Sequence, residues 1–258
     1  MSHSKVYIIT GASRGLGEAF AAQLMTPDNW LLCVSRTRNE ALVRQAQSAG
    51  VRLDWFECDL AGLSADGAAD SLLNRMFGGA VPEVSRIRLI NNAGVIDPIG
   101  PAHDCKAGDA AHNIAINLTA PMALTAAFLR ATQALPADKR VMQISSGAGR
   151  HPYAGWSAYC AAKAGLDHFT RCVKLEQDAL PHGAKVASVA PGVLDTEMQA
   201  QIRKSNADRF PSHSRFVQMY EKGSLVPPRK AAERLLEFLE HPEFGNEPVV
   251  DIRDWNTE

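Results

Sequence analysis

The sequence lacks the patterns that build metal centres and disulfide frameworks. Its five cysteines are an odd number and form no CxxC pair, and its eight histidines occur in no HxxxH or HxH arrangement. We therefore expect reduced thiols, histidines that serve packing or solvation, and no metal site. Thiols that stay reduced are typical of a protein of the cytoplasm.

Long hydrophobic runs and an excess of one charge are also missing. No window reaches about 18 uninterrupted apolar residues, and the apolar-rich stretch LTAPMALTAAFL is interrupted by Pro121. The N-terminal apolar run is too short for a signal peptide, so a soluble cytoplasmic protein without membrane contact is expected. Lys and Arg total 27 against 28 Asp and Glu, with no run of like charge. This balance argues against a nucleic-acid partner.

What the sequence does contain is a regular alternation of strand-like and helix-like segments. The strand-like runs are residues 6–10, 30–35, 52–58, 87–92, 140–145, 184–190 and 247–252. Helix-period segments lie near residues 15–25, 39–48, 64–77, 109–131, 157–179 and 228–240. Strands that alternate with helices pair in parallel through right-handed crossovers. The pattern predicts an α/β fold, a single domain over residues 1–258 with a doubly wound, seven-stranded parallel sheet and helices on both faces.

One long segment, residues 194–227, has no clear strand character and is rich in polar residues. A doubly wound sheet binds its ligands outside the carboxyl ends of its strands, and long connections there usually carry function. We expect this segment to form a lid over the substrate site.

Three glycines, Gly11, Gly15 and Gly17, follow the first strand-like run. In dinucleotide-binding loops, one glycine allows a tight turn, one lets the backbone approach a pyrophosphate, and one permits close packing of helix on strand. The following helix N-terminus favours the anion. The spacing here is GxxxGxG rather than GxGxxG, and a plain strand-to-helix turn has a similar composition. The loop alone leaves both interpretations open.

With the motifs that follow it in order, the loop resembles the short-chain dehydrogenase/reductase family over nearly the whole chain. These motifs are TGASRGLG (residues 10–17), CDL (58–60), NNAG (91–94), INL (116–118), ISSGAG (144–149), YCAAK (159–163) and PGVLDT (191–196). Ser146 and Tyr159 are thirteen residues apart, which matches the family pattern and selects Ser146 over Ser145. The resemblance implies a Rossmann-type oxidoreductase.

The same resemblance implies that Asn117, Ser146, Tyr159 and Lys163 are the catalytic residues. Tyr159 and Lys163 are four apart on a helical segment and share a face, and a cation beside a phenol lowers the phenol's pKa from about 10. Tyr159 can then protonate a carbonyl oxygen as hydride arrives at carbon, while Ser146 hydrogen-bonds that oxygen. From the resemblance, Lys163 also binds the nicotinamide ribose, and Asn117 holds a water that links Lys163 to solvent. Each motif alone has a structural alternative: a surface pair, a serine cap or a polar helix residue.

The residues after the second strand-like run indicate which nicotinamide cofactor is bound. An NAD site carries an acid about twenty residues past the glycines, for the ribose 2′-hydroxyl, and here Ser35 stands in its place. Arg36 and Arg14 can clamp a 2′-phosphate, whereas simple solvation of both arginines is the alternative. We expect NADPH as cofactor and reduction as the working direction. The resemblance assigns cofactor contacts to Gly11, Ser13, Arg14, Gly15, Leu16, Gly17, Ser35, Arg36, Asp59, Leu60, Asn92, Ala93, Gly94, Tyr159, Lys163, Pro191, Gly192, Val193 and Thr196.

The C-terminal third resembles the sepiapterin reductases and bacterial benzil reductases of this family. The resemblance rests on PGVLDTEMQ (191–199), GSLVPPRKAAERLLEFLE (223–240) and VVDIRDW (249–255). It implies a carbonyl reductase that acts on a vicinal dicarbonyl or on a pterin side-chain carbonyl. Trp156, Met198 and Gln199 are candidates for the substrate pocket, with packing under the lid as the alternative. Asp251 looks like an aspartate that anchors a pterin, or else it pairs with a basic group such as Arg253.

Two other functions stay open. One is an alcohol dehydrogenase that works oxidatively with NAD, which the missing acid at Ser35 disfavours. The other is an NADP(H)-binding sensor or scaffold without turnover, which the complete catalytic set disfavours. The resemblance also implies a homodimer or homotetramer that pairs through the helices holding Asn117 and Tyr159.

Overall fold

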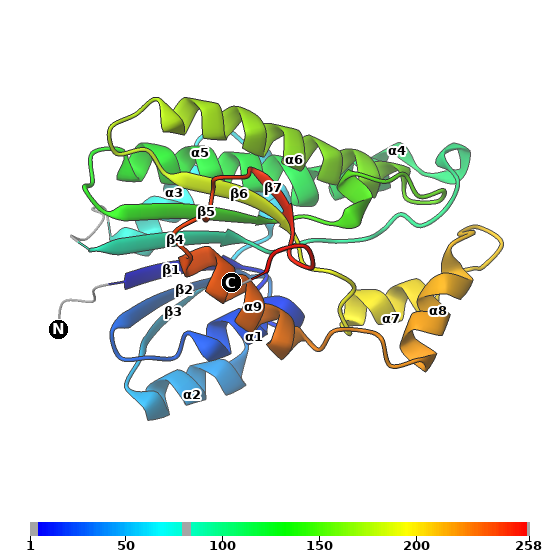
Figure 1. Cartoon of the computed structure of the whole chain (residues 1–258), viewed down its shortest axis with the longest axis horizontal. Helices are drawn as coiled ribbons and strands as arrows, with labels where there is room; N and C mark the ends of the chain where they lie inside the picture. The colour runs from blue at the N-terminus through cyan, green and yellow to red at the C-terminus, as the bar shows by residue number, and fades with distance from the viewer. Residues whose placement is uncertain (1–4, 79–83, 257–258) are drawn as a thin grey trace.

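A parallel sheet of seven strands forms the centre of the computed structural model, which describes residues 5–78 and 84–256 (Figure 1). The strands are β1 (Lys5–Thr10), β2 (Asn29–Ser35), β3 (Arg52–Glu57), β4 (Arg86–Asn91), β5 (Asp138–Ile144), β6 (Lys185–Ala190) and β7 (Val249–Asp251). Their order across the sheet is β3-β2-β1-β4-β5-β6-β7, and every neighbouring pair is parallel. The predicted fold class is therefore confirmed, and each strand-like run overlaps one observed strand.

Helices cover both faces of the sheet (Figure 1). One layer is α1 (Gly15–Gln23), α2 (Glu40–Ala49) and α9 (Pro228–Glu240); the other is α3 (Ala68–Phe77), α4 (Ala107–Ile114), α5 (Ala120–Thr132) and α6 (Ser157–Asp178). Along β1, Tyr7 and Ile9 pack into the α1 layer, while Val6 and Ile8 pack into the α3 layer. Because both faces are covered, the strands read as continuous apolar runs without polar alternation.

Helices α4 and α5 are joined by a π-helical segment, Ala115–Thr119. By length and composition alone, the whole stretch Ala107–Thr132 could cross a membrane, with a mean hydropathy of 1.4. Core helices of soluble proteins pass the same test, and here α5 buries Leu124 and Phe128 in the α3 layer. Short 3₁₀ turns at Leu60–Ser64, Ala102–Asp104 and Gly147–Gly149 complete the connections.

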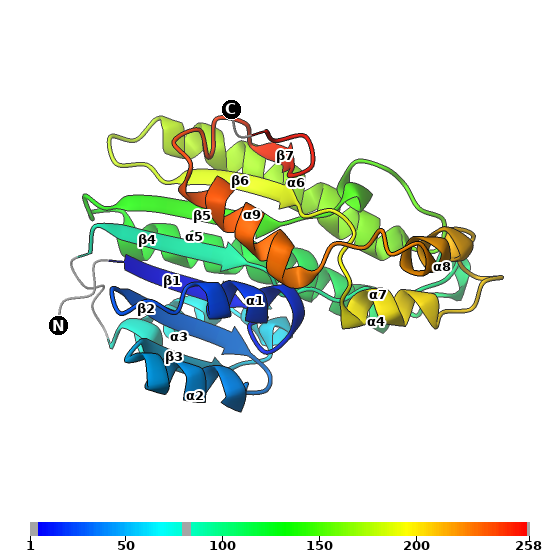
Figure 2. The same ribbon diagram turned by 60° about the horizontal axis from the view of Figure 1, so that its bottom comes forward.

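Two helices that the sequence did not predict lie within residues 194–227: α7 (Glu197–Arg203) and α8 (His213–Glu221). Figures 1 and 2 show that both helices lie beyond the carboxyl ends of the strands, outside the two helix layers that cover the sheet. The excursion closes at its base, where the Val226 N–H donates to the Val193 carbonyl (2.9 Å) and the Asp195 N–H donates to the Val226 carbonyl (3.0 Å).

Candidate active site

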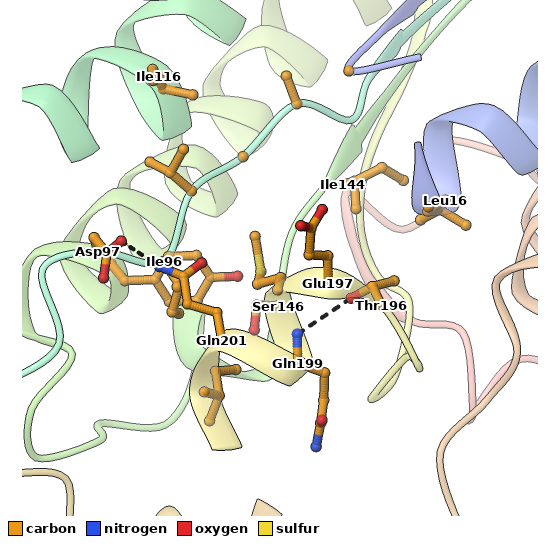
Figure 3. A pocket seen from close by; sticks show the side chains of 18 of the residues that line it. Leu16, Ile96, Asp97, Ile116, Ile144, Ser146, Thr196, Glu197, Gln199 and Gln201 are labelled. Carbon is orange, nitrogen blue, oxygen red and sulfur yellow. Dashed lines mark hydrogen bonds between the residues drawn. The ribbon is translucent and has the colours of Figure 1, made fainter. Parts of the chain in front are cut away.

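A cavity of about 1800 Å³ runs along the carboxyl ends of the strands. The strand order reverses between β1 and β4, and this is where a doubly wound sheet opens a ligand crevice. All predicted site residues line the cavity except Gly17 and Asn117. Figure 3 shows part of its lining, which includes Ser146 after β5 and Thr196 and Glu197 at the start of α7.

The glycine loop packs too tightly for side chains. Gly11 has φ 68°, and a Cβ there would lie 2.9 Å from the Cα of Ala93; a Cβ at Gly17 would lie 2.2 Å from the Gly11 carbonyl oxygen. The loop therefore lies against the NNAG motif and brings the N-terminus of α1 to the cavity. A bare backbone turn that leads into a helix N-terminus fits a pyrophosphate.

Two residues that the sequence analysis missed brace this loop. The Oγ1 of Thr10 accepts from the N–H groups of Asn92 (3.0 Å) and Ala93 (3.1 Å), and the Asn92 amide donates to the Thr10 carbonyl (2.9 Å). The side chain of Asn39, which caps α2, donates to the Ser13 carbonyl (2.9 Å). Asn92 thus holds β1 to the loop after β4. The cap position of Asn39 before a helical pattern was the available signal.

The adenosine side of the cavity carries arginines and no carboxylate at the end of β2. Ser35 ends that strand, and its hydroxyl donates to the Thr37 carbonyl (2.7 Å). Arg14 forms an ion pair with Glu197 of α7, in which both side chains are about two-thirds exposed. Arg36 is exposed at the cavity and forms no ion pair within residues 5–78 and 84–256. At the end of β2, the guanidinium of Arg36 is thus available to a phosphate.

Two further side chains near the adenosine side have local partners. Asp59 is exposed at the cavity and caps the 3₁₀ turn Leu60–Ser64 by accepting from the Ala61 N–H (3.1 Å). Arg38 lines the cavity as well, but it pairs with Glu40 at 3.3 Å.

Tyr159 and Ser146 meet through their side chains. Tyr159 lies on the buried face of α6 and is 7% exposed. Burial raises the pKa of Tyr159 to about 12, and a hydrogen bond with Ser146 opposes the rise. Ser145 points elsewhere, because its hydroxyl donates to Asp167 (2.6 Å). The structure therefore brings Ser146, rather than Ser145, to the phenol.

Lys163 lies one turn further along α6, and its expected effect on Tyr159 was wrong. Its Nζ donates to the Ile144 carbonyl (2.8 Å) and is 5.7 Å from the centre of the Tyr159 ring. Burial lowers the pKa of Lys163 to about 8, with Asp167 opposing the shift. The pKa of Tyr159 lies above its ordinary value rather than below it, because removing the phenolate from water outweighs the favourable contacts.

Asn117 is fully buried inside the π-helical segment. Its amide donates to the Val95 carbonyl (2.8 Å) and to the Asn113 side chain (2.9 Å), and its Oδ1 accepts from the Val95 N–H (3.1 Å). The side chain thus holds the loop after β4. Pro121, four residues on, has no N–H, so the main-chain carbonyl of Asn117 cannot receive the usual helical hydrogen bond.

An aromatic wall closes the end of the cavity beyond Tyr159. Trp156, 4% exposed, stacks on Phe210 with ring centres 4.6 Å apart and meets the Tyr159 ring edge-on at 5.8 Å. Tyr153 and Phe216 lie 5.1 Å and 5.2 Å from it. Ile96, Ile202 and Met198 pack against the same cluster. The sequence analysis proposed Trp156 and Met198 but missed the others, because the wall combines segments far apart in the chain.

Gln199 and Asp251, proposed for substrate contact, both have partners inside the protein. Gln199 is 3% exposed and donates to the Phe216 carbonyl (3.1 Å), and in Figure 3 its side chain points away from Ser146. Asp251 accepts from Arg150 (2.9 Å) and from Arg253 (2.8 Å at each oxygen). These hydrogen bonds, that of Arg253 first, hold the pKa of Asp251 below its usual value. The arginine pairing is the alternative that the sequence had left open.

Comparisons with known proteins point to the family that the sequence motifs resemble. A family model described as short chain dehydrogenase matches residues 5–207. The benzil reductase of Bacillus cereus, an (S)-benzoin-forming enzyme, is 38% identical over 95% of this chain and 98% of its own. The sepiapterin reductase of Rattus norvegicus is 32% identical over 96% of each chain.

Among solved structures, a metagenomic short-chain oxidoreductase in complex with NADP superposes with a TM-score of 0.70. It is 27% identical to this chain, and the match covers 96% of both chains.

Proposed function

The chain belongs to the short-chain dehydrogenase family, and from this premise we propose that it is an NADPH-dependent carbonyl reductase with Tyr159 as proton donor. The observation that carries the proposal is the meeting of Ser146, Tyr159 and Lys163 at one end of the cavity, beneath an aromatic wall. A carbonyl group placed there has a neutral acid, a second hydrogen-bond donor and a buried cation within one site.

The glycine loop, the end of β2 and Lys163 are the groups that would hold the cofactor. When bound, NADPH supplies the hydride that reduces the carbonyl carbon. The backbone turn at Gly11 and the N-terminus of α1 suit the pyrophosphate, and Arg36 suits the 2′-phosphate. The solved relative with NADP supports the same choice of cofactor.

Tyr159 acts as a neutral phenol in this proposal. With a pKa of about 12 it keeps its proton at neutral pH and has that proton to give. Ser146 hydrogen-bonds the substrate oxygen, and after proton transfer it stabilises the phenolate of Tyr159. Lys163, cationic below a pKa of about 8, adds positive charge nearby.

Proton return to Tyr159 requires a path out of a buried site. We assign to Asn117 the role of holding a water, through its main-chain carbonyl rather than its side chain. The side chain is hydrogen-bonded to Val95 and Asn113, whereas the main-chain carbonyl lacks its usual helical donor because Pro121 has no N–H. Such a water would link Lys163 to solvent.

The aromatic wall favours a flat, apolar dicarbonyl as substrate. Tyr153, Trp156 and Phe216 line the cavity beside Tyr159, and aromatic rings bind aryl groups through stacked or edge-on contacts. The benzil reductase relative supports this class. A pterin, the second candidate, is supported by the sepiapterin reductase relative, but it would need Asp251, which two arginines hold.

We also propose a cytoplasmic homodimer or homotetramer in which α7 and α8 form the substrate lid. The outer faces of α5 and α6 support pairing, since Met122 is 37% exposed and Leu175 is 75% exposed. The five free cysteines fit a reducing compartment. Sedimentation of the purified protein tests the assembly.

The direct test is to follow the absorbance of the reduced nicotinamide with benzil, a diketo pterin and a simple alcohol, each with NADP(H) and NAD(H). Reduction of benzil by NADPH, lost in Tyr159→Phe, is the expected result. Oxidation of alcohols with NAD would indicate the dehydrogenase alternative. Tight NADPH binding without turnover of any carbonyl would indicate a sensor or scaffold.

A further inference from the structure

Asp167 is a buried carboxylate that the proposed mechanism does not use. It lies on the inner face of α6 and is 2% exposed. Its Oδ1 accepts two hydrogen bonds of 2.6 Å, one from Ser145 at the end of β5 and one from Ser188 in β6. The side chain therefore ties α6 to the two strands whose ends carry the site.

The second oxygen of Asp167 is the unusual one. Within residues 5–78 and 84–256, Oδ2 has no hydrogen-bond partner although it is buried. The loop after Ser146 lies directly over it, since a Cβ at Gly149 would come 2.6 Å from Oδ2. Burying a charged oxygen without a partner is costly, so a compensating charge is expected nearby.

Lys163 is the cation on which this carboxylate acts, electrostatically and without a direct ion pair. It lies four residues before Asp167, one turn away on the same buried face, and is 4% exposed. Its other neighbours carry no negative charge at neutral pH: the phenol of Tyr159 on α6, the Ile144 carbonyl of β5, and the Asn117 amide of the π-helical segment.

The other elements around α6 offer Lys163 no free negative charge among the described residues. Asp251 of β7 is held by two arginines, and β6 faces α6 with the neutral Ser188. In the 3₁₀ turn Gly147–Gly149 there is no ionisable side chain. Cys160, on α6 itself, has a raised pKa and stays neutral.

Helices α4 and α5 and the C-terminal half of α6 carry the rest of the nearby titratable groups. On α4 these are the exposed Asp109 and His112, and on α5 the Arg130 that pairs with Asp70. On α6 they are the exposed His168, Arg171, Cys172 and Glu176, and the Lys174 that pairs with Asp178. Of all these groups, Asp167 is the one whose charge acts on the Lys163 ammonium.

We propose that Asp167 is a positioning residue for the reaction: its negative charge keeps Lys163 protonated, and its bond to Ser145 holds the neighbouring Ser146 against Tyr159. The inference rests on the proposed function for its consequence in catalysis, but the charge coupling is a property of the folded chain. A lysine buried without a counterion loses its proton readily, since burial disfavours the charged form.

The coupling has a direction that can be measured. Burial places the pKa of Lys163 at about 8 while Asp167 opposes the fall. Removing the negative charge lowers the pKa of Lys163 further, so the ammonium is lost at a lower pH. An opposite charge nearby favours the charged form of a group, so without the charge of Asp167 we expect the midpoint of the Lys163 titration to move to lower pH.

The test compares Asp167→Asn, which keeps the shape and Oδ1 but removes the charge, with Ser188→Ala, which removes one hydrogen bond and keeps the charge. The first readout is the titration of Lys163 by NMR in protein labelled at the lysine side chain, assigned with Lys163→Met. The second is the pH dependence of kcat for NADPH-driven reduction of benzil. Asp167→Asn should move both transitions to lower pH, and Ser188→Ala should move neither.

Asp167→Ser, which leaves room for a water beside the two serines, is a second neutral variant in case Asp167→Asn folds poorly. An unchanged Lys163 titration in either folded neutral variant overturns the proposal, and so does an equal shift in Ser188→Ala. Failure of both neutral variants to fold would make Asp167 a structural residue and would also overturn it. Because the NMR titration needs no turnover, it stays decisive even if benzil and pterins prove not to be substrates.

Discussion

The hydrogen bond of Lys163 goes to the carbonyl of Ile144, while its Nζ stays 5.7 Å from the centre of the Tyr159 ring. Lys163 therefore stands beside the phenol without being bonded to it. Burial raises the pKa of Tyr159 to about 12, so the phenol holds its proton firmly. Such a group is poorly suited to act as a resting phenolate base and well suited to donate a proton to a reduced carbonyl.

Replacing Tyr159 with Phe removes this donor and keeps the ring against Trp156. We expect kcat for carbonyl reduction to fall by at least ~10²-fold, the usual contribution of a positioned acid. NADPH affinity, measured by fluorescence titration, should hardly change, because the ring packing is retained. Near-normal turnover in this variant would remove Tyr159 from the mechanism.

The cofactor preference is expected to rest on Arg36 more than on Arg14. Arg36 is free of ion pairs among the described residues, whereas Arg14 already pairs with Glu197. Arg36→Ala should weaken NADPH binding by about 1.5 to 3 kcal/mol and leave NADH binding unchanged, since only NADPH carries the 2′-phosphate.

Arg14→Ala is the matched control for this measurement. We expect a smaller loss of NADPH affinity, because a phosphate at Arg14 must compete with the Glu197 carboxylate. Equal losses of NADPH and NADH affinity in Arg36→Ala would mean that Arg36 does not read the 2′-phosphate.

Much of the fold and of the site could be predicted because the signals are local. Strands buried on both faces appear as apolar runs, and the residues of the site directly follow strands or share one helix face, as Tyr159 and Lys163 do. The order of the motifs then placed them at one edge of the sheet. The predicted strand 247–252 was too long, because only Val249–Asp251 pairs with β6.

The parts that could not be predicted depend on tertiary contacts. Helices α7 and α8 are polar on much of their surface, and their few apolar residues, such as Ile202 and Phe216, pack against segments far away in the sequence. The raised pKa of Tyr159 follows from burial, which no local pattern reports. The aromatic wall likewise forms only when residues near 153–156 meet Phe210 and Phe216 in space.

At the opposite end of the sheet, stability is expected to depend on the buried Arg88. Its side chain is fully buried and bonds Glu240 of α9 (2.9 Å) and Asp138 of β5 (2.7 Å). Arg88→Met removes the buried cation and leaves Asp138 with Arg140 and Glu240 with Arg86 as their remaining partners, so it should lower the free energy of unfolding by about 1 to 3 kcal/mol. Arg86→Met is the control, because Arg86 is 45% exposed and meets the same Glu240 at 3.4 Å; its cost should be about 0 to 1 kcal/mol.

The same network predicts a loss of stability in acid. Burial favours protonation of Asp138 and Glu240, but hydrogen bonds and charges from Arg140 and Arg88 outweigh it, so the pKa of each carboxyl is lower in the folded state. Their contribution is complete above the unfolded-state pKa and is lost as the pH falls through the folded-state pKa. Denaturant unfolding of the wild type and Arg88→Met as a function of pH should show the two curves converging in acid. A constant difference between them would show that these carboxylates are not coupled to Arg88.

The substrate class can be decided at Asp251. In the structure this carboxylate accepts hydrogen bonds from Arg150 and Arg253. These bonds join the loop after β5 to the C-terminal segment. If its role is confined to those arginines, Asp251→Asn should change KM for benzil and for a diketo pterin by the same small factor. If instead a pterin displaces an arginine and donates its planar edge to the carboxylate, only the pterin loses a charge-assisted contact, and its KM should rise several-fold. Steady-state kinetics with both substrates on wild type and variant separate the two cases. We expect the equal response, because each oxygen of Asp251 already accepts from a guanidinium and an aryl diketone offers the carboxylate no donor.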